Sequence, residues 1–223
     1  MDAGHWTAEL RRWVSGRRVI VAQQVAAAAT ARVAELRDLG ASELLVLDTH
    51  GTGAGPLPDT ARVSLGLSAT GMSVDEGIHA SNAALAALPD EAAAALDRFD
   101  PDRSALVLGS FLNEAAALAG RPFACYRRAE WVALDDKTIV DALWDRVGVE
   151  HAPSTVVAAT ADAVVGVWPQ VDLGDGVVLA VDAAHGWTGG AEGTRPVRSR
   201  VELEAALAGW GGRRVRVMPF LEG

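Results

Sequence analysis

The chain has 223 residues, half of them hydrophobic, so it can bury the core of one large domain or two small ones. Its net charge is -9 and its basic residues are scattered rather than gathered into a stripe, which disfavours a nucleic-acid partner. A single cysteine, Cys125, excludes an internal disulfide, and no signal segment or apolar run of membrane length is present, so we expect a cytoplasmic protein without membrane contact.

The first part of the chain alternates short β-branched runs with helical patterns. Residues 7–15 are amphipathic and predict a docking helix. Residues 18–22 predict a strand, residues 23–39 keep a helical period that ends at Gly40, and residues 43–47 predict a second strand. This strand-helix-strand order implies parallel strands joined by a right-handed crossover.

The pattern continues less regularly to about residue 130. Residues 59–75 show no periodicity, and the alanine-rich stretch 82–99 predicts two helical pieces separated by Pro89. Three further elements complete an open α/β sheet of Rossmann type: a strand at 105–108, a short helix at 114–119 and a strand at 122–126.

The usual signatures of other enzyme classes are absent from the sequence. The turn after the first strand lacks G-x-G-x-x-G, which disfavours a dinucleotide site at this sheet. The glycine-rich segment 51–56 follows the second strand, but Pro56 and Pro58 argue against a helix there, so it is either a surface loop or a loop that touches a ligand. The histidines do not form a metal-ligand pattern, and no Ser-His-Asp or Cys-His arrangement is evident.

From residue 131 the pattern changes. Asp135 and Asp136 predict the cap of a helix that ends at Gly148 and has one apolar stripe, formed by Ile139, Val140, Leu143, Trp144 and Val147. Lys137 then falls in the first turn, where the helix macrodipole disfavours a cation. It is either part of a solvated salt bridge or a lysine held to meet an anionic ligand.

The last part of the chain predicts a strand, a glycine-rich loop, a strand, a helix and a strand. The loop holds four glycines, Gly186, Gly189, Gly190 and Gly193. Glycines permit positive φ and close backbone approach, so successive amides of the loop can face phosphate oxygens. The loop is either a lid over a ligand or the long turn of a β-hairpin.

Six features in this order resemble the ATP-grasp ligase family. They are Asp136-Lys137, the helix that ends at Gly148-Val149 with Pro153 after it, the strand 177–180, the loop that ends in Gly193-Thr194, the helix 201–207, and the terminal run from Val215 through Met218-Pro219-Phe220-Leu221 to Gly223. The resemblance covers residues 104–223 by motif and the first hundred by architecture. It implies an α/β fold in which a Rossmann-like open parallel sheet, residues 1–130, precedes a small α+β ATP-grasp lobe, residues 131–223.

The resemblance also implies a reaction. ATP, with Mg²⁺, would phosphorylate a small carboxylate, and an amine would displace the phosphate from the acyl phosphate to form an amide or peptide bond. Lys137 would contact the ATP phosphates, and the glycine loop with Thr194 would close over them. The Pro219 carbonyl and the Leu221 amide, beside Met218, would pair with the edge of the adenine.

Two departures from the family pattern shape the functional hypothesis. Ala180 stands where the family usually has a second phosphate-binding lysine. The family's magnesium ligands and substrate-binding arginine lie in a second lobe after the hinge, beyond Gly223. We therefore expect the N-terminal portion of a longer ligase, inactive by itself. The alternative is a non-catalytic nucleotide- or metabolite-binding module, and a homo-oligomer is one option for its assembly.

Overall fold

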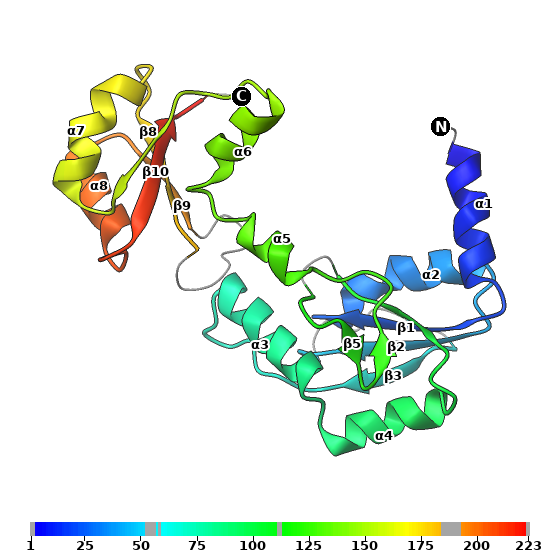
Figure 1. Ribbon diagram of the computed structural model, residues 1–223. Helices are drawn as coiled ribbons and strands as arrows, with labels where there is room; N and C mark the ends of the chain where they lie inside the picture. The colour runs from blue at the N-terminus through cyan, green and yellow to red at the C-terminus, as the bar shows by residue number, and fades with distance from the viewer. Residues whose placement is uncertain (1–2, 52–56, 58, 111–112, 184–192, 222–223) are drawn as a thin grey trace. The chain divides into compact units, whose positions relative to one another are not determined.

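The computed structural model describes residues 3–51, 57, 59–110, 113–183 and 193–221. The chain divides into two compact units, Met1–Arg128 and Ala129–Gly223. Each unit contains a β-sheet with helices packed on it (Figure 1) and has a hydrophobic core of its own.

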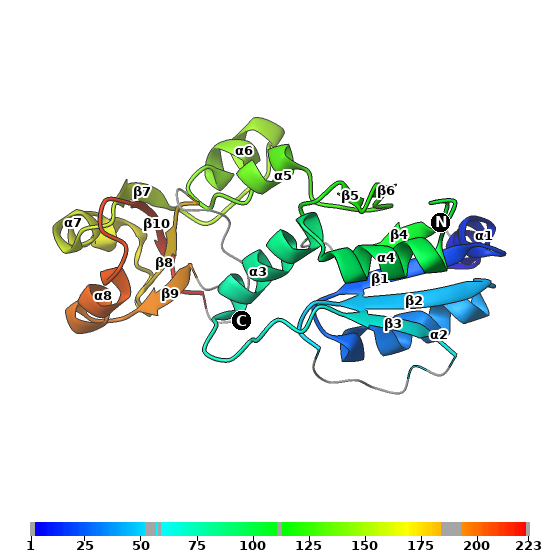
Figure 2. The ribbon, with the colours of Figure 1, turned by 90° about the horizontal axis from the view of Figure 1, so that it is seen from below.

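Unit 1 is built on a parallel sheet of four strands in the order β3-β2-β1-β4 (Figure 2). Its elements are α1 (Ala3–Val14), β1 (Arg18–Gln23), the 3-10 helix η1 (Ala26–Ala29), α2 (Thr30–Asp38), β2 (Glu43–Asp48), β3 (Ala61–Ser64), α3 (Val74–Ala86), α4 (Asp90–Phe99), β4 (Leu106–Leu108), β5 (Ala117–Leu118) and β6 (Arg121–Pro122). The strand order reverses at β1, because β2 and β3 lie on one side of it and β4 on the other. This is the Rossmann-like open sheet that the sequence predicts.

The sheet of unit 1 is buried on both faces. Val19 and Val21 of β1 pack with α2 on one face, and Ile20 and Ala22 pack with α3 and α4 on the other. Strands that are buried on both faces carry continuous hydrophobic runs. For this reason β1 and β2 were predictable from the sequence.

Four elements of unit 1 differ from the prediction. The strand expected at 122–126 is not part of the four-stranded sheet: its place holds only the end of β6 and an isolated bridge from Phe123 to Val107. β3 lies within the stretch that was expected to be irregular, and the helix expected at 114–119 is replaced by the hairpin of β5 and β6. β3 is short, and its Arg62 and Ser64 are hydrogen-bonded to the buried Asp48, so it carries no hydrophobic signal. The helix expected at 23–39 is divided into η1 and α2. The separation of α3 from α4 at Pro89 is confirmed.

Unit 2 is built on an antiparallel sheet in the order β7-β10-β8-β9. Its elements are α5 (Ala129–Ala133), α6 (Val140–Val147), β7 (Thr155–Ala158), α7 (Ala161–Val171), β8 (Val177–Val181), β9 (Thr194–Val197), α8 (Arg200–Leu207) and β10 (Arg214–Pro219). Strands β8, β9 and β10 and helix α8 match the predicted elements. β7 and α7 were not predicted. With unit 1, this small α+β lobe confirms the expected fold class.

The two faces of the sheet in unit 2 are covered differently (Figure 1). Val215 and Val217 of β10 and Leu179 of β8 share a core with residues of α7 and α8. Side chains alternate along a strand, so Arg216 points to the opposite face, where it contacts Asp141 of α6. Helix α6 therefore lies on the face that α7 and α8 leave open.

The structure corrects the predicted start of α6. The helix begins at Val140, and Thr138 donates to the Asp136 carboxylate from its backbone amide and its hydroxyl, at 2.8 and 2.7 Å. These bonds hold a turn before the helix instead of capping it. Lys137 thus lies in that turn, not in the first helical turn, and the macrodipole argument does not apply to it. Gly148, with φ of 71°, ends α6 in the left-handed conformation, as predicted.

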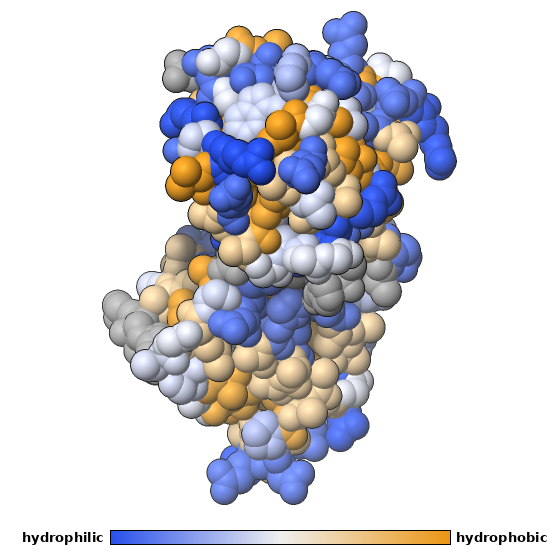
Figure 3. All heavy atoms as spheres, turned by 90° about the vertical axis from the view of Figure 1, so that its left-hand side faces the viewer, coloured by the Kyte–Doolittle hydropathy of each residue, from blue (hydrophilic) through white to orange (hydrophobic). Residues whose placement is uncertain are grey.

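Hydrophobic side chains also occur on the surface. On the face shown in Figure 3, hydrophobic residues are interspersed with hydrophilic ones. Scattered surface hydrophobics are usual in folded proteins and indicate no binding site by themselves. Within the described parts of the chain, no helix has the length and hydrophobicity needed to cross a membrane.

Candidate functional site

The end of β10 directs one backbone carbonyl past the part of the strand that pairs with β7. Ala159 donates to the Arg213 carbonyl on the β7 side, whereas Phe220 donates to the Gly176 carbonyl on the β8 side. Backbone groups of an antiparallel strand alternate between its two neighbours. Odd-numbered residues of β10 therefore face β7, which pairs only as far as Val217. The Pro219 carbonyl points to that side, past the last paired residue.

On the sheet of unit 2, three residues of adjacent strands lie side by side in one row. In the strand register, Ala180 of β8 lies between Thr194 of β9 and Arg216 of β10. Residues opposite each other in adjacent strands present their side chains to the same face. Arg216 thus lies directly beside the position at which the resembling family carries a lysine.

The Arg216 guanidinium is already engaged. It is 5% exposed and binds both carboxylate oxygens of Asp141, with Nε 2.9 Å from Oδ2. Nε also donates to the Ser154 hydroxyl at 3.1 Å, and the Trp144 ring centroid lies 5.3 Å from the guanidinium carbon. A bidentate pair of this kind neutralises the cation. Arg216 is therefore a buried structural cation in this state and not a free substitute for the lysine.

The titration behaviour of this cluster follows from its contacts. Burial by itself would raise the pKa of Asp141, but hydrogen bonds from Arg216 and Ser154 outweigh it and hold the pKa below its usual range. The pKa of His151 is raised, first by its hydrogen bond to the Ala152 carbonyl and then by Asp145. Both shifts favour the charged forms.

Of the other seven predicted ATP contacts, four lie among the described residues and three do not. Lys137 is exposed in the turn before α6 and is the only lysine of the chain. Gly193 is buried and its carbonyl accepts from Val181 at 2.9 Å, Met218 is half-buried in β10, and Leu221 is 62% exposed. The remaining three predicted glycines, Gly186, Gly189 and Gly190, lie outside the described residues.

A second polar site, missed from the sequence, lies at the carboxyl edge of the sheet in unit 1. A small crevice there, with a volume of about 10 Å³, is lined by Gln23, Gln24, Ile78, Ser81, Asn82, Leu85, Ser110 and Asn113. Gln23 is the last residue of β1, and the others follow β1 or β4 or belong to α3. In open α/β sheets, ligands bind outside the carboxyl ends of the strands where the strand order reverses. The signal in the sequence was limited to Gln23-Gln24 at the end of β1 and Ser110 two residues after β4.

Asn113 is the residue of this crevice with an unsatisfied group. It is 6% exposed, its Oδ1 accepts from Ser110 at 3.3 Å, and its Nδ2 has no hydrogen-bond partner among the described residues. A Cβ at Gly109 would lie 2.2 Å from that Nδ2, so only glycine leaves room for the amide. A buried donor without a partner costs free energy and is usually explained by a ligand or a water.

Next to the crevice, three side chains at the same sheet edge satisfy one another. The Ser81 hydroxyl lies 2.8 Å from the Thr49 hydroxyl and 3.1 Å from His50 Nε2, and it donates to the Gly77 carbonyl at 2.8 Å. The Ser81–His50 contact resembles a nucleophile–base pair, but both residues are buried, and among the described residues no carboxylate hydrogen-bonds to His50. We interpret these hydrogen bonds as structural, because they hold the side chains beside the crevice in place.

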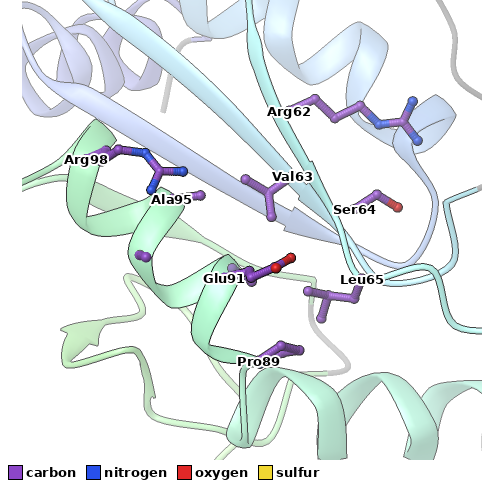
Figure 4. Close-up of a pocket in the computed structure, with 10 residues that line it drawn as sticks. Arg62, Val63, Ser64, Leu65, Pro89, Glu91, Ala95 and Arg98 are labelled. Atoms are coloured by element: carbon purple, nitrogen blue, oxygen red, sulfur yellow. The ribbon is translucent and has the colours of Figure 1, made fainter.

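A larger groove of about 570 Å³ lies between the edge strand β3 and α4 (Figure 4). Its lining includes Val63, Pro89 and three alanines, with Glu91 and Arg98 as exposed charges. The charged group of Arg62 points away from the groove to Asp48, 2.8 Å away, and this bond raises the pKa of Arg62. Few polar groups converge in this groove, so its chemistry is less specific than that of the crevice.

No protein-family model and no curated protein sequence matches the chain. Among solved structures, the chain is similar to the ADP complex of PurK, an N5-carboxyaminoimidazole ribonucleotide synthetase, with a TM-score of 0.50 and 9% sequence identity. The similarity covers 93% of this chain and 48% of that one, so the chain spans about half the length of the PurK structure. PurK is an ATP-grasp ligase. The fold is ATP-grasp-like.

Within the described residues, no group of three or more His, Cys, Asp or Glu side chains is arranged to hold a metal ion. An ATP-grasp-like fold by itself does not establish a reaction. Any assignment of chemistry therefore rests on the backbone edge at Pro219, Lys137 and the sheet-edge crevice.

Proposed function

We propose that the chain is part of an ATP-dependent carboxylate–amine ligase and that unit 2 binds the nucleotide. The observation that carries this proposal is the Pro219 carbonyl, which points past the end of β7 in a fold similar to that of an ADP-bound enzyme. The carbonyl would accept from the adenine amino group, and the Leu221 amide would donate to the adjacent ring nitrogen. The exposed Lys137 would contact the phosphates.

The crevice of unit 1 would hold a polar group of the second reactant. Its lining of amides and hydroxyls provides both donors and acceptors, and Asn113 Nδ2 would donate to an oxygen of that reactant. ATP supplies the phosphoryl group that activates the carboxylate. The chain's own residues would bind and orient the reactants.

The proposal is tested most directly through Lys137, because it is the only lysine. An amine-acylating reagent modifies Lys137 and the chain's amino terminus, so the terminus serves as an internal control. We expect ATP with Mg²⁺ to slow acylation of Lys137, measured by peptide mass spectrometry, and to leave the terminus unchanged. Equal rates at Lys137 with and without saturating ATP would contradict its phosphate role.

A matched substitution series extends this test. Lys137→Ala should weaken ATP binding by about 1 to 3 kcal/mol, the range for the loss of a charge-assisted hydrogen bond. Arg146→Ala removes an exposed positive charge from the last turn of α6 and should leave the affinity unchanged. Equal losses for both variants would indicate a general charge effect.

A non-catalytic nucleotide- or metabolite-binding module is the second candidate. It is favoured by Ala180 at the family's lysine position and by the neutralised state of Arg216 beside it. The two candidates differ in turnover. ATP binding by the full protein without ADP release, across carboxylate and amine mixtures, would support the binding module and contradict the ligase.

A further inference from the structure

Helix α1 presents a hydrophobic stripe to solvent. Trp6, Leu10 and Trp13 are 53%, 45% and 54% exposed, and their spacing of four and three residues places them on one face of the helix. Between Gly4 and Val14, only Val14 is buried. In Figures 1 and 2, α1 projects from the end of unit 1 at which it joins β1.

An uncovered stripe of this kind is unusual for energetic reasons. Helices of about 12 residues are marginal in water, and in proteins most of their stability comes from packing of the amphipathic face. The apolar face of α1 is not buried by other described residues of the chain. Its tryptophans are also the side chains that contribute most to protein interfaces.

The stripe is self-complementary about a two-fold axis. Leu10 lies near its centre, with Trp6 four residues before it and Trp13 three after it, so an antiparallel copy places Trp6 against the second Trp13. Glu9 and Arg12 lie along the same flank and form an ion pair within one helix. The same axis sets Glu9 of one helix beside Arg12 of the other. An isologous dimer contact requires this kind of self-complementarity.

We propose that α1 is a self-association surface that pairs antiparallel with α1 of a second copy of this chain. A membrane surface is disfavoured because helices that bind anionic lipids carry a predominantly basic polar face. Helix α1 carries two arginines, Arg11 and Arg12, against Glu9, which is fewer than the roughly four to eight basic residues of a lipid-binding cluster, and the chain has a net charge of -9. This proposal does not depend on the nucleotide site.

The size of the stripe determines how strong the contact is. Three side chains of this size, each about half exposed, offer on the order of 300 Å² per copy, so a helix pair would bury roughly 600 Å². Stable interfaces bury at least ~1,200 Å² in total. We therefore expect weak association that depends on protein concentration.

The first test is sedimentation velocity over a series of protein concentrations. The wild-type chain should shift from monomer to dimer as concentration rises, and Trp6→Glu should raise the midpoint concentration by about tenfold or more. Val201→Glu is the matched control, because Val201 is 78% exposed on helix α8 of unit 2. It should leave the midpoint unchanged. A wild-type chain that stays monomeric at all concentrations would overturn the proposal, as would equal shifts for both variants.

Charge reversal separates self-pairing from a loss of helix stability. Glu9→Arg and Arg12→Glu each break the pair within one helix and place like charges across the axis, so each variant alone should dimerise less than wild type. A mixture of the two variants should associate, because the reversed position 9 of one then faces the reversed position 12 of the other. Heterodimers should appear only in the mixture. Failure of the mixture to associate, or binding of the wild-type chain to anionic lipid vesicles through Trp6, would overturn the proposal.

Discussion

At the scale of single residues, the buried Arg121 makes several hydrogen bonds that join two parts of unit 1. It is fully buried, and its guanidinium donates to Asp100 Oδ2 at 2.7 Å and to the Asp100 carbonyl at 2.6 Å. Asp100 also accepts from the backbone amides of Ser104 and Ala105. This network fixes the β5–β6 hairpin to the end of α4.

Arg121→Ala should therefore destabilise unit 1 strongly. Breaking a buried ion pair leaves an uncompensated charge and costs about 3 to 5 kcal/mol. The measurement is chemical denaturation followed by circular dichroism. Arg103→Ala, which removes an exposed partner of Asp97, is the control and should cost less than about 1 kcal/mol. Similar losses for the two variants would contradict the structural role of Arg121.

Asn113 should behave in the opposite way. Asn113→Ala removes an unsatisfied buried donor, so it should change the free energy of unfolding by less than about 1 kcal/mol or increase it. Gly109→Ala places a Cβ against Asn113 Nδ2 and should destabilise, and the double variant should recover part of that loss. Strict additivity in the double-mutant cycle would show that the two residues do not contact each other.

At the scale of elements, the contact between α6 and β10 organises the open face of unit 2. Asp141 of α6 and Arg216 of β10 are separated by 75 residues and bind bidentately. His151 lies 3.4 Å from Asp141 and 3.1 Å from Asp145. Asp141 thus joins α6 to the sheet through Arg216, and His151, in the loop after α6, places a second cation beside Asp141. The stability of this contact should therefore depend on pH.

The direction of that dependence follows from the two shifts. The pKa of His151 is raised in the folded chain, so its contribution is present in acid and is lost as pH rises from about 6.5 through the folded-state value. The pKa of Asp141 is lowered, so its contribution is lost as pH falls through its folded-state value. The midpoint temperature of thermal unfolding of unit 2 should therefore be highest between these two pH limits.

His151→Gln should remove the loss of stability above neutral pH and keep most of the acid limb, because Arg216 and Ser154 lower the pKa of Asp141 more than His151 does. His79→Gln is the control, because His79 lies in α3 of unit 1. The measurement is the midpoint of thermal unfolding of unit 2 as a function of pH. If the two variants have the same profile, His151 does not hold α6.

At the scale of the whole molecule, the chain contains two compact units with separate cores. We expect two unfolding transitions in calorimetry. Leu203→Ala in the core of unit 2 and Leu45→Ala in the core of unit 1 should each cost about 2 to 5 kcal/mol and lower a different transition. A single transition that both variants shift equally would mean that the units unfold together.

The sequence by itself determined the elements that carry strong local signals. Hydrophobic runs buried on both faces indicated β1 and β2, Pro89 separated two helices, and Gly148 marked the end of α6. The order of motifs also indicated the α/β fold and named Pro219 as an adenine contact, which remains a prediction. These signals are local because they depend on residues within a few turns of one element.

Only the tertiary structure decided the features that join distant parts of the chain. β3 was not evident because its polar Arg62 and Ser64 are satisfied by Asp48, a buried residue of another strand. The direction of the Pro219 carbonyl follows from the strand register, and the engagement of the Arg216 cation follows from its ion pair with Asp141. Register and burial pair residues that are far apart in sequence, and hydrophobic periodicity contains no information about those pairs.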